Sequence, residues 1–307
     1  MGPAGDAETQ AEVVGGITAE VSLAVAAKAS GENFPVALKV LPQHWRRHLT
    51  ALYGFARLTD DLGDEPLPGL DISTTPKAVY TATRLRLLDE LQQDIARIYD
   101  GGMPELQAIR TLAETVRECK IPQQPFDDLI EANRQDQTVT RYETYDDLVK
   151  YCELSANTVG QIVLYIFGAA TEERLKFSDR ICTALQLAEH WQDVAEDLGN
   201  GRVYLPQEDL KSYGVTEDDL ARPAANEAVK RLMAFETGRA KELLDQGAPL
   251  TGTLKGAARI AISGYIAGGR AAFKAIRQAD YDVLTRTPKP SKAATLAGLV
   301  SCYVIGR

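Results

Sequence analysis

The feature that most limits the fold is a helical hydrophobic pattern that runs through nearly all of the 307 residues. Apolar positions recur at helical spacing, and the alternating runs bounded by turn residues that are typical of β-strands are absent. No internal repeat or shift in composition divides the chain. We therefore expect one all-α domain over residues 17–307, preceded by a disordered N-terminus at residues 1–16.

Turn-forming residues bound the expected helices. Pro42 stands near the start of one helix, and Thr171 or Ser178 is suited to cap another. Loops are expected at Pro66–Pro76 and Gly199–Pro206. The helices are expected at residues 17–30, 43–64, 77–98, 103–118, 125–135, 145–168, 174–198, 225–246, 254–279 and 291–304. The helices at 145–168 and 174–198 are too apolar for a surface position, so we expect them at the centre of the fold.

Composition narrows the class of partner. A net charge of −9 disfavours nucleic acid, whose phosphates require a basic surface. A phosphorylated small molecule stays compatible with this charge, because a metal ion can invert the local sign. The four scattered cysteines have no CxxC spacing, which favours reduced cytosolic thiols over a zinc site or a disulfide framework.

No segment has the features of a targeting or membrane-spanning sequence. The polar N-terminus lacks the order of a signal peptide, and no run reaches the roughly 18–20 apolar residues of a membrane span. The mildly apolar stretch at residues 293–305 is expected to be a packing helix, with contact to a membrane surface as the alternative.

The first of two acidic clusters reads Asp60-Asp61-Leu62-Gly63-Asp64-Glu65 and ends an expected helix. Tyr53, Arg57, Asp60 and Asp64 fall within an arc of roughly 60° at 100° per residue. Carboxylates at a helix C-terminus oppose the helix dipole, which favours a bound cation. A solvated face with an ion pair from Arg57 to Asp60 or Asp61 is the alternative.

The second cluster reads Asp193-Val194-Ala195-Glu196-Asp197, more than a hundred positions later. Gln186, Glu189, Asp193 and Asp197 share one helix face, with His190 at its edge. Carboxylate and water oxygens, completed by substrate phosphate, are the ligands that Mg²⁺ prefers. Two such faces turned toward each other predict a magnesium–diphosphate site. A satisfied helix histidine is the simpler interpretation of His190, and a core position that of Trp191.

Residues near the clusters add candidate ligand contacts. Arg202 and Tyr204 place a basic and a phenolic side chain beside the acids, where Arg202 is suited to clamp a phosphate. An ion pair from Arg202 to Glu196 or Asp197 is the alternative. Arg286, Lys289 and Lys292 supply either phosphate counter-charge or a solvated loop.

The small-residue segment Tyr151–Gly160 either lets helices approach closely or leaves room for a long apolar ligand. Tyr151, Ser155 and Thr158 share a face of this segment. Ser155 has no accompanying histidine–acid pair, which makes it a poor candidate for a catalytic nucleophile.

These residues resemble the squalene/phytoene synthase family, all-α head-to-head prenyl transferases of the class I isoprenoid synthase fold. The resemblance runs from about residue 30 to residue 285 in the family's order. The matching segments are Glu32–Pro35, Ala51–Arg57, Asp60–Glu65, Pro125–Ile130, Arg141–Leu148, Tyr151–Gly160, Leu185–Asp197 and Gly201–Pro206. The resemblance implies a single helical bundle around a central cavity.

Within the family, the details are most similar to bacterial hydroxysqualene synthases of hopanoid biosynthesis. Glu32–Pro35 stands where most relatives have a Ser-Phe-Tyr type motif, Ser-Ala-Asn ending at Asn157 stands where they have Val-Ala-Gly, and Gln192 stands where they have an arginine. Glu189 departs from the asparagine that is a metal ligand in relatives, although a carboxylate can also bind Mg²⁺.

The resemblance implies two or three Mg²⁺ ions on a diphosphate, and it implies roles for particular residues. The implied metal ligands are Asp60, Asp61, Asp64, Glu189, Asp193 and Asp197. The implied catalytic residues are Asp60, Asp64, Asp193, Asp197, Tyr53, Arg57 and Tyr151. The implied substrate contacts are Phe34, Arg57, Ser155, Asn157, Gln186, Gln192, Arg202 and Tyr204.

The expected reaction converts presqualene diphosphate and water to hydroxysqualene and diphosphate. Water quenches the cation, so no NADPH is expected. One alternative is a presqualene diphosphate, squalene or phytoene synthase that condenses two prenyl diphosphates head to head. A second is a non-catalytic helical assembly subunit, against which the retained aspartates argue. We expect a cytoplasmic protein, and leave open peripheral membrane contact and transient association with neighbouring pathway enzymes.

Overall fold

The computed structural model describes residues 41–67, 70–71, 73–290, 298–299 and 301–303. These residues form helices joined by loops, with one isolated parallel bridge between Arg141 and Val203 and no strand among them. The all-α prediction is confirmed. The expected helix at 17–30, the N-terminus at 1–16 and Phe34 all lie outside the described residues.

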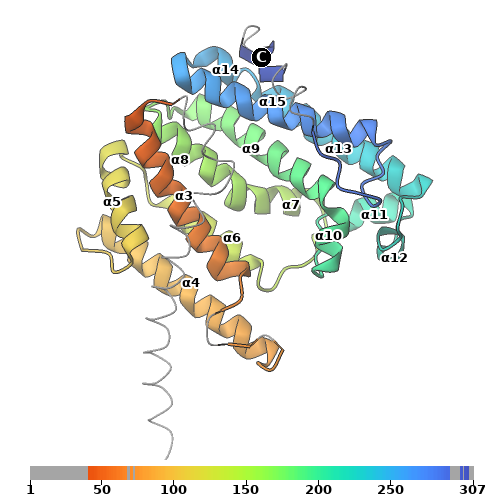
Figure 1. The fold of residues 1–307 in the computed structure, drawn as a ribbon, viewed down its shortest axis with the longest axis horizontal. Coiled ribbons are helices and arrows are strands. Elements are labelled where there is room, and N and C mark those ends of the chain that lie inside the picture. The colour runs from red at the N-terminus through yellow and green to blue at the C-terminus, as the bar shows by residue number, and fades with distance from the viewer. Residues whose placement is uncertain (1–40, 68–69, 72, 291–297, 300, 304–307) are drawn as a thin grey trace, which may run out of the picture. The chain divides into compact units, whose positions relative to one another are not determined.

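The chain divides into two compact units at Thr138 and Val139, and each unit is described by itself. The first unit holds four helices in its described residues, with α3 packed against the other three (Figure 1). They are α3 (Gln43–Asp64), α4 (Lys77–Tyr99), α5 (Gln107–Cys119) and α6 (Gln124–Gln135). Phe55 of α3 and Phe126 of α6 meet edge to face in the core, 5.2 Å between ring centroids. The single-domain extent stays a prediction.

The C-terminal end of α3 is held by two side chains of α4. The buried Arg84 donates to the backbone oxygens of Leu62 at 3.1 Å and Glu65 at 2.9 Å. Tyr80 lies under the same guanidinium, and its hydroxyl accepts from the backbone N–H of Leu67 at 2.7 Å. The last carbonyls of a helix have no partner within the helix and carry negative partial charge. Arg84 satisfies two such groups, and so supplies part of the positive charge expected at this helix end.

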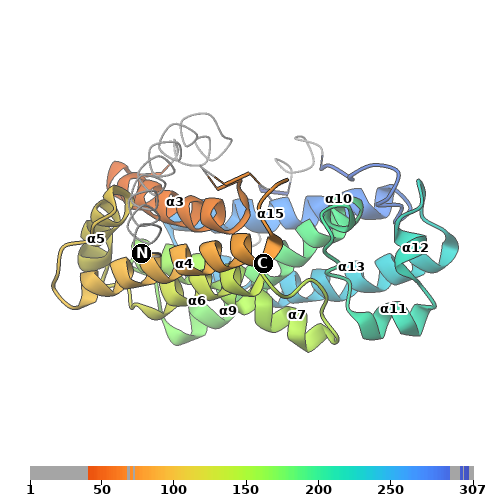
Figure 2. The same ribbon diagram turned by 90° about the horizontal axis from the view of Figure 1, so that it is seen from below.

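The second unit is built around α9, which packs against α13, α15, α8 and the π-helical turn η1. Figure 2 shows α11 at one end of α13. The helices described in the second unit are α7 (Tyr145–Cys152), η1 (Glu153–Asn157), α8 (Thr158–Ile166), α9 (Glu172–Gln192), α10 (Val194–Gly199), α11 (Gln207–Tyr213), α12 (Glu217–Leu220), α13 (Glu227–Gly247), α14 (Leu250–Thr253) and α15 (Gly256–Gln278). The Thr171 hydroxyl caps α9 by accepting from the N–H of Arg174. The central position predicted for α9 is confirmed within this unit.

Three expectations about helix boundaries are corrected. The helix expected at 174–198 is interrupted at Asp193, where the backbone has φ −109° and ψ 18°. The helix expected at 145–168 contains the π turn at Glu153–Asn157, which its hydrophobic pattern does not reveal. The short helices α11, α12 and α14 were not expected, because four to seven residues carry too little periodicity to detect.

Small residues bring η1 and α8 close to α9, which is the first of the two alternatives that the sequence left open for this segment. A Cβ atom added at Gly160 would lie 2.7 Å from the Ser178 Oγ and would also collide with the Cys182 Sγ. Asn157 and Thr183 are buried nearby, and the Thr183 hydroxyl donates to the Asn157 Oδ1 at 3.0 Å. This close approach fixes the π turn on α9.

The loop after α10 pairs with the segment before α7. The backbone N–H groups of Val203, Gln207 and Glu208 donate to the carbonyls of Thr140, Tyr142 and Glu143 at 2.9 to 3.0 Å. These bonds hold residues 202–205 in one conformation. They also place two aromatic side chains of the loop region, Tyr142 and Tyr204, side by side.

Replacing Gly160 by alanine tests the tight contact with α9. We expect Gly160→Ala to lower the free energy of unfolding by about 1–3 kcal/mol, because the added methyl group overpacks the interface. Gly268→Ala on α15 is the matched control, since a Cβ atom there meets nothing within 4 Å. The control is expected to be stabilising by up to about 1 kcal/mol, through helix propensity. Urea unfolding measures both, and equal midpoints for the two variants would contradict the packing.

Candidate functional site

In the first unit, two carboxylates of the acidic cluster are exposed and two belong to an arginine network. Asp60 and Asp64 are exposed in the last two turns of α3. The Arg57 Nε lies 2.8 Å from the Oδ1 of the buried Asp61, and the Arg57 Nη2 lies 3.0 Å from the Glu65 Oε1. The ion pair that the sequence left open therefore forms with Asp61. Its place beside Arg57 makes Asp61 a support for the helix end, and its role as a metal ligand stays a prediction.

Although Asp60 is exposed, the protein around it shifts the pKa of its carboxyl. Its pKa is raised to about 7, first because the surrounding protein removes it partly from water and then because of the Asp64 charge. A hydrogen bond from the Asn133 side chain and the nearby Arg57 act in the opposite direction. A cation beside Asp60 and Asp64 would relieve the like-charge repulsion.

Asn133 is a residue of this site that sequence reasoning missed. It is buried on α6 and packs against Gly63, where an added Cβ atom would collide with its side chain. The side chain of Gln137, one turn later, donates to the Gly63 carbonyl at 3.1 Å. Asn133 follows Leu129 by four positions on the apolar face of the helix. A polar amide on an apolar face requires a hydrogen-bond partner, and this pattern could have identified Asn133 from the sequence.

In the second unit, the acidic cluster spans the break between α9 and α10. The Asp193 N–H donates to the Glu189 carbonyl at 3.0 Å, and the Asp197 N–H donates to the Asp193 carbonyl at 2.8 Å. Helix-type hydrogen bonds thus continue across the break and keep these carboxylates near one another. Burial, followed by the charge of Asp193, raises the pKa of Asp197 to about 7 and raises the pKa of Glu189.

The segment at residues 285–289 covers the start of this cluster. Burial and the Glu196 charge raise the pKa of Asp193, whereas a hydrogen bond from the Thr287 side chain and the Lys289 charge oppose that rise. The Gln192 side-chain amide donates to the backbone oxygen of Pro288. Lys289 was a candidate counter-charge from the sequence, but Thr287 was missed, because nothing near it in the sequence connects it to an acid 94 positions away.

A group of aromatic rings borders the second cluster. His190 and Tyr204 stack with 3.7 Å between ring centroids and 15° between planes. Burial, with a smaller contribution from the Arg202 charge, lowers the pKa of His190 to about 3, so the ring is neutral. The Gln186 amide lies 3.2 Å from the His190 Nε2, and Tyr151 packs against both rings at 5.9 to 6.3 Å. The prediction of a satisfied histidine fits this environment.

The structure also gives the surroundings of three other residues of this unit that the sequence analysis singled out. The Arg202 Nη1 donates to the Tyr204 hydroxyl at 3.4 Å, beside Asp197. The Ser155 hydroxyl donates to the Tyr151 carbonyl at 3.0 Å, within the π turn. Trp191 is fully buried, as expected of a core residue. Interruptions of this π type are frequent at functional sites, because they turn side chains out of the regular helical register.

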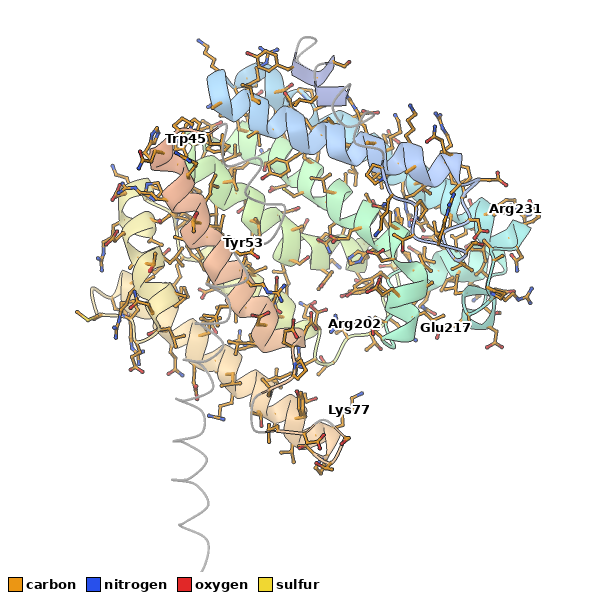
Figure 3. All side chains as sticks on the ribbon, in the orientation of Figure 1. Trp45, Tyr53, Lys77, Arg202, Glu217 and Arg231 are labelled. Atoms are coloured by element: carbon orange, nitrogen blue, oxygen red, sulfur yellow. The ribbon has the colours of Figure 1, made fainter. Side chains whose placement is uncertain are left out.

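Each unit therefore contains one set of predicted site residues. The first set is Tyr53, Arg57, Asp60, Asp61 and Asp64, and the second is Tyr151, Ser155, Asn157, Gln186, Glu189, Gln192, Asp193, Asp197, Arg202 and Tyr204. In Figure 3, Tyr53 lies along α3 of the first unit, and Arg202 lies beside α10 of the second. That both sets act on one ligand stays a prediction, as do the individual roles.

The donor chemistry of each cluster suits Mg²⁺. Among the described residues, no three acidic, histidine or cysteine side chains converge closely enough to hold a metal ion. Mg²⁺ does not require such a cage, because it keeps several waters and is usually bound by one or two carboxylates together with substrate phosphates. Asp60 with Asp64, and Asp193 with Asp197, provide such pairs.

Comparison with known proteins assigns the family. Residues 27–294 match the family described as squalene/phytoene synthase. A hydroxysqualene synthase from Rhodopseudomonas palustris is 32% identical over 225 residues, covering 73% of this chain and 72% of that protein. A chloroplastic phytoene synthase from Daucus carota is 31% identical over 278 residues, covering 89% of this chain and 67% of that protein. The chain belongs to the squalene/phytoene synthase family, whose members act on prenyl diphosphates.

Solved structures agree with this assignment. A squalene synthase, HpnC, from Alicyclobacillus acidocaldarius is 37% identical with a TM-score of 0.75, covering 88% of this chain and 98% of that one. A dehydrosqualene synthase is 22% identical with a TM-score of 0.77, covering 96% of this chain and 98% of that one, and so supports the fold alone. Within the part of the chain that the structure describes, no helix combines the length and the apolar character needed to cross a membrane. Cys119, Cys152, Cys182 and Cys302 form no disulfide in the structure.

Replacing Asp197 by asparagine tests the electrostatic state of the second cluster. The raised pKa means that stability from the protonated carboxyl is present below about pH 4 and is lost as the pH rises through about 7. We therefore expect Asp197→Asn to raise the melting temperature of the ligand-free protein at pH 8, and to raise it clearly less at pH 5, where the carboxyl of the folded protein is still protonated. Asp218→Asn on α12, which is exposed, is the control and should show no such difference. A decrease at pH 8 would contradict the repulsion.

Proposed function

We propose that this protein is a hydroxysqualene synthase, which converts presqualene diphosphate and water to hydroxysqualene and diphosphate. The observation that carries the proposal is the environment of Asp193. The preceding side chain is the neutral Gln192, whose amide donates to the Pro288 carbonyl. By the resemblance drawn from the sequence, this position is an arginine in most of the family. Similarity to a hydroxysqualene synthase and to the HpnC squalene synthase supports the same assignment.

We further propose that both acidic clusters hold Mg²⁺ bound to the same diphosphate. When bound, Mg²⁺ supplies the positive charge that draws electron density from the leaving oxygen. Asp60, Asp64, Asp193 and Asp197 would hold and orient the metal ions, with Glu189 in support. Arg57 holds the end of α3 in place through Asp61 and Glu65, and Arg202 is suited to contact a phosphate oxygen.

The rings of Tyr151 and Tyr204 are proposed to face the apolar part of the substrate. Aromatic faces attract a developing carbocation through their quadrupole. The neutral His190 behind Tyr204 adds no positive charge that would oppose this cation. Tyr53 and Phe34 are proposed to contribute in the same way.

The second candidate is the head-to-head condensation of two prenyl diphosphates, as in a phytoene or squalene synthase. Similarity to the Daucus carota phytoene synthase over 89% of the chain favours it. The two activities use the same carboxylates and differ in the substrate and in the fate of the cation. They are therefore separated by a product assay.

The deciding experiment supplies purified protein and Mg²⁺ with presqualene diphosphate, with farnesyl diphosphate or with a longer C20 prenyl diphosphate, without NADPH. We expect hydroxysqualene from presqualene diphosphate, identified by mass spectrometry, because water can quench the cation without a hydride donor. Formation of presqualene diphosphate from farnesyl diphosphate, or of a C40 product from a longer prenyl diphosphate, would instead assign the condensation activity.

The role of the carboxylates is tested with Asp60→Ala and Asp193→Ala. We expect each variant to lose at least about a thousandfold in turnover, by analogy with the loss of an electrostatic group that acts on the transition state. Circular dichroism should show an intact helical fold, and Asp218→Asn should retain wild-type activity. Turnover of either alanine variant near the wild-type rate would refute the metal role.

Mg²⁺ with diphosphate should raise the melting temperature at pH 8 far more than at pH 5, because protons compete with the metal for the carboxylate ligands.

We propose that the protein works in the cytoplasm, in peripheral contact with a membrane. Presqualene diphosphate carries a long hydrocarbon, and the product loses the only charged group of the substrate. Such molecules partition into lipid, so direct exchange with a membrane surface or with neighbouring pathway enzymes avoids release into water.

A further inference from the structure

A cavity of about 360 Å³ lies between α13 and α15 of the second unit. Its size falls in the range of small-molecule sites, roughly 300–1,000 Å³. None of its lining residues belongs to either acidic cluster. They are Ala234, Thr237, Gly238, Lys241, Arg270, Phe273, Lys274, Arg277 and Tyr281.

The charge of this cavity is opposite to that of the protein. Four of the lining residues are cationic and none is acidic, on a chain whose net charge is −9. Arg270 and Lys241 both pair with Asp245, at 2.7 and 2.6 Å. Lys274 and Arg277 are exposed, and their side chains form no ion pair or hydrogen bond with any described residue. The cavity thus concentrates positive charge that the folded chain only partly balances.

The hydroxyl of Thr237 is a second, independent sign of a ligand. Thr237 is 5% exposed, lines the cavity and has a buried Oγ1 without a hydrogen-bond partner in the described protein. Helical threonines usually donate to the carbonyl four residues earlier, as Thr59 does to Phe55 at 2.9 Å. A buried hydroxyl that makes no such bond is destabilising unless another molecule supplies the partner.

We propose that this cavity binds a phosphate-bearing ligand, independently of the proposed reaction. Lys274 and Arg277 contact the phosphate oxygens, Lys241 adds charge at the rim, and the Thr237 hydroxyl donates from the buried wall. A phosphate carries close to two negative charges and so matches two cations, whereas a carboxylate would leave one of them unbalanced. Phe273 and Tyr281 contact the rest of the ligand. The phosphate belongs either to a soluble phosphate or diphosphate or to the headgroup of an anionic lipid.

The first arm of the test measures binding of inorganic diphosphate to the full chain by calorimetry in EDTA. Without Mg²⁺, the acidic clusters repel diphosphate, so binding reports the cavity. For a soluble ligand, we expect Lys274→Gln and Arg277→Gln each to weaken binding about tenfold, through loss of one charge-assisted hydrogen bond. Arg231→Gln is the matched control, since Arg231 is an exposed residue of α13 outside the cavity lining (Figure 3).

Thr237→Val separates a ligand contact from a structural role. Valine keeps the shape of the side chain and removes the hydroxyl. We expect the melting temperature of the free protein to stay the same or rise, because a buried unpartnered group is lost. Binding of the phosphate ligand should weaken by about tenfold. A lower melting temperature with unchanged binding would assign the hydroxyl to the fold and overturn this part of the site.

The second arm measures flotation with phosphatidylglycerol vesicles, with phosphatidylcholine vesicles as the neutral reference. Binding to the anionic vesicles that falls in Lys274→Gln and Arg277→Gln assigns the phosphate to a lipid headgroup. Diphosphate binding without vesicle binding assigns it to a soluble ligand. The proposal is overturned if neither probe binds, or if the cavity variants and Arg231→Gln bind both probes equally. Because no arm measures turnover, the result does not depend on the proposed reaction.

Discussion

Like charges held close together at helix ends are the constraint on which both acidic clusters depend. In water the repulsion between such carboxylates is weak, because the solvent screens their charges. Partial burial removes part of this screening and raises the free energy of ionising them. The pKa values of Asp60 and Asp197 are each raised to about 7 for this reason, with Asp64 and Asp193 as the second cause. Functional sites commonly lower the stability of a protein. Repulsion between carboxylates is therefore compatible with a site at which a bound cation neutralises them.

The surrounding structure reduces this repulsion in two different ways. In the first unit, Arg57 pairs with Asp61 and Glu65, Arg84 caps the last carbonyls of α3, and Asn133 donates to Asp60. In the second unit, the helix is interrupted at Asp193, and Thr287 and Lys289 compensate part of its charge. Both arrangements leave carboxylates that a hydrated cation with a diphosphate can reach.

Charge of the opposite sign is gathered elsewhere in the second unit. The cavity between α13 and α15 is lined by four cationic residues and no acidic one, and the hydroxyl of Thr237 in its wall has no hydrogen-bond partner among the described residues. In the two proposals, the acidic clusters require a metal to hold a phosphate, whereas the cavity does not. The chemical difference between them is the sign of the charge that their side chains carry.

The sequence by itself determined the helices and the acidic clusters, because helical periodicity and i, i+4 spacing are local properties of the chain. It also predicted the Arg57–Asp61 pair as an alternative and the close packing at Gly160. Only the tertiary structure decided the break at Asp193, the π turn at η1 and the contacts of Arg84, Asn133 and Thr287 with the acidic helix ends. These features depend on residues far apart in the chain, and no local pattern encodes which distant groups will share a buried space.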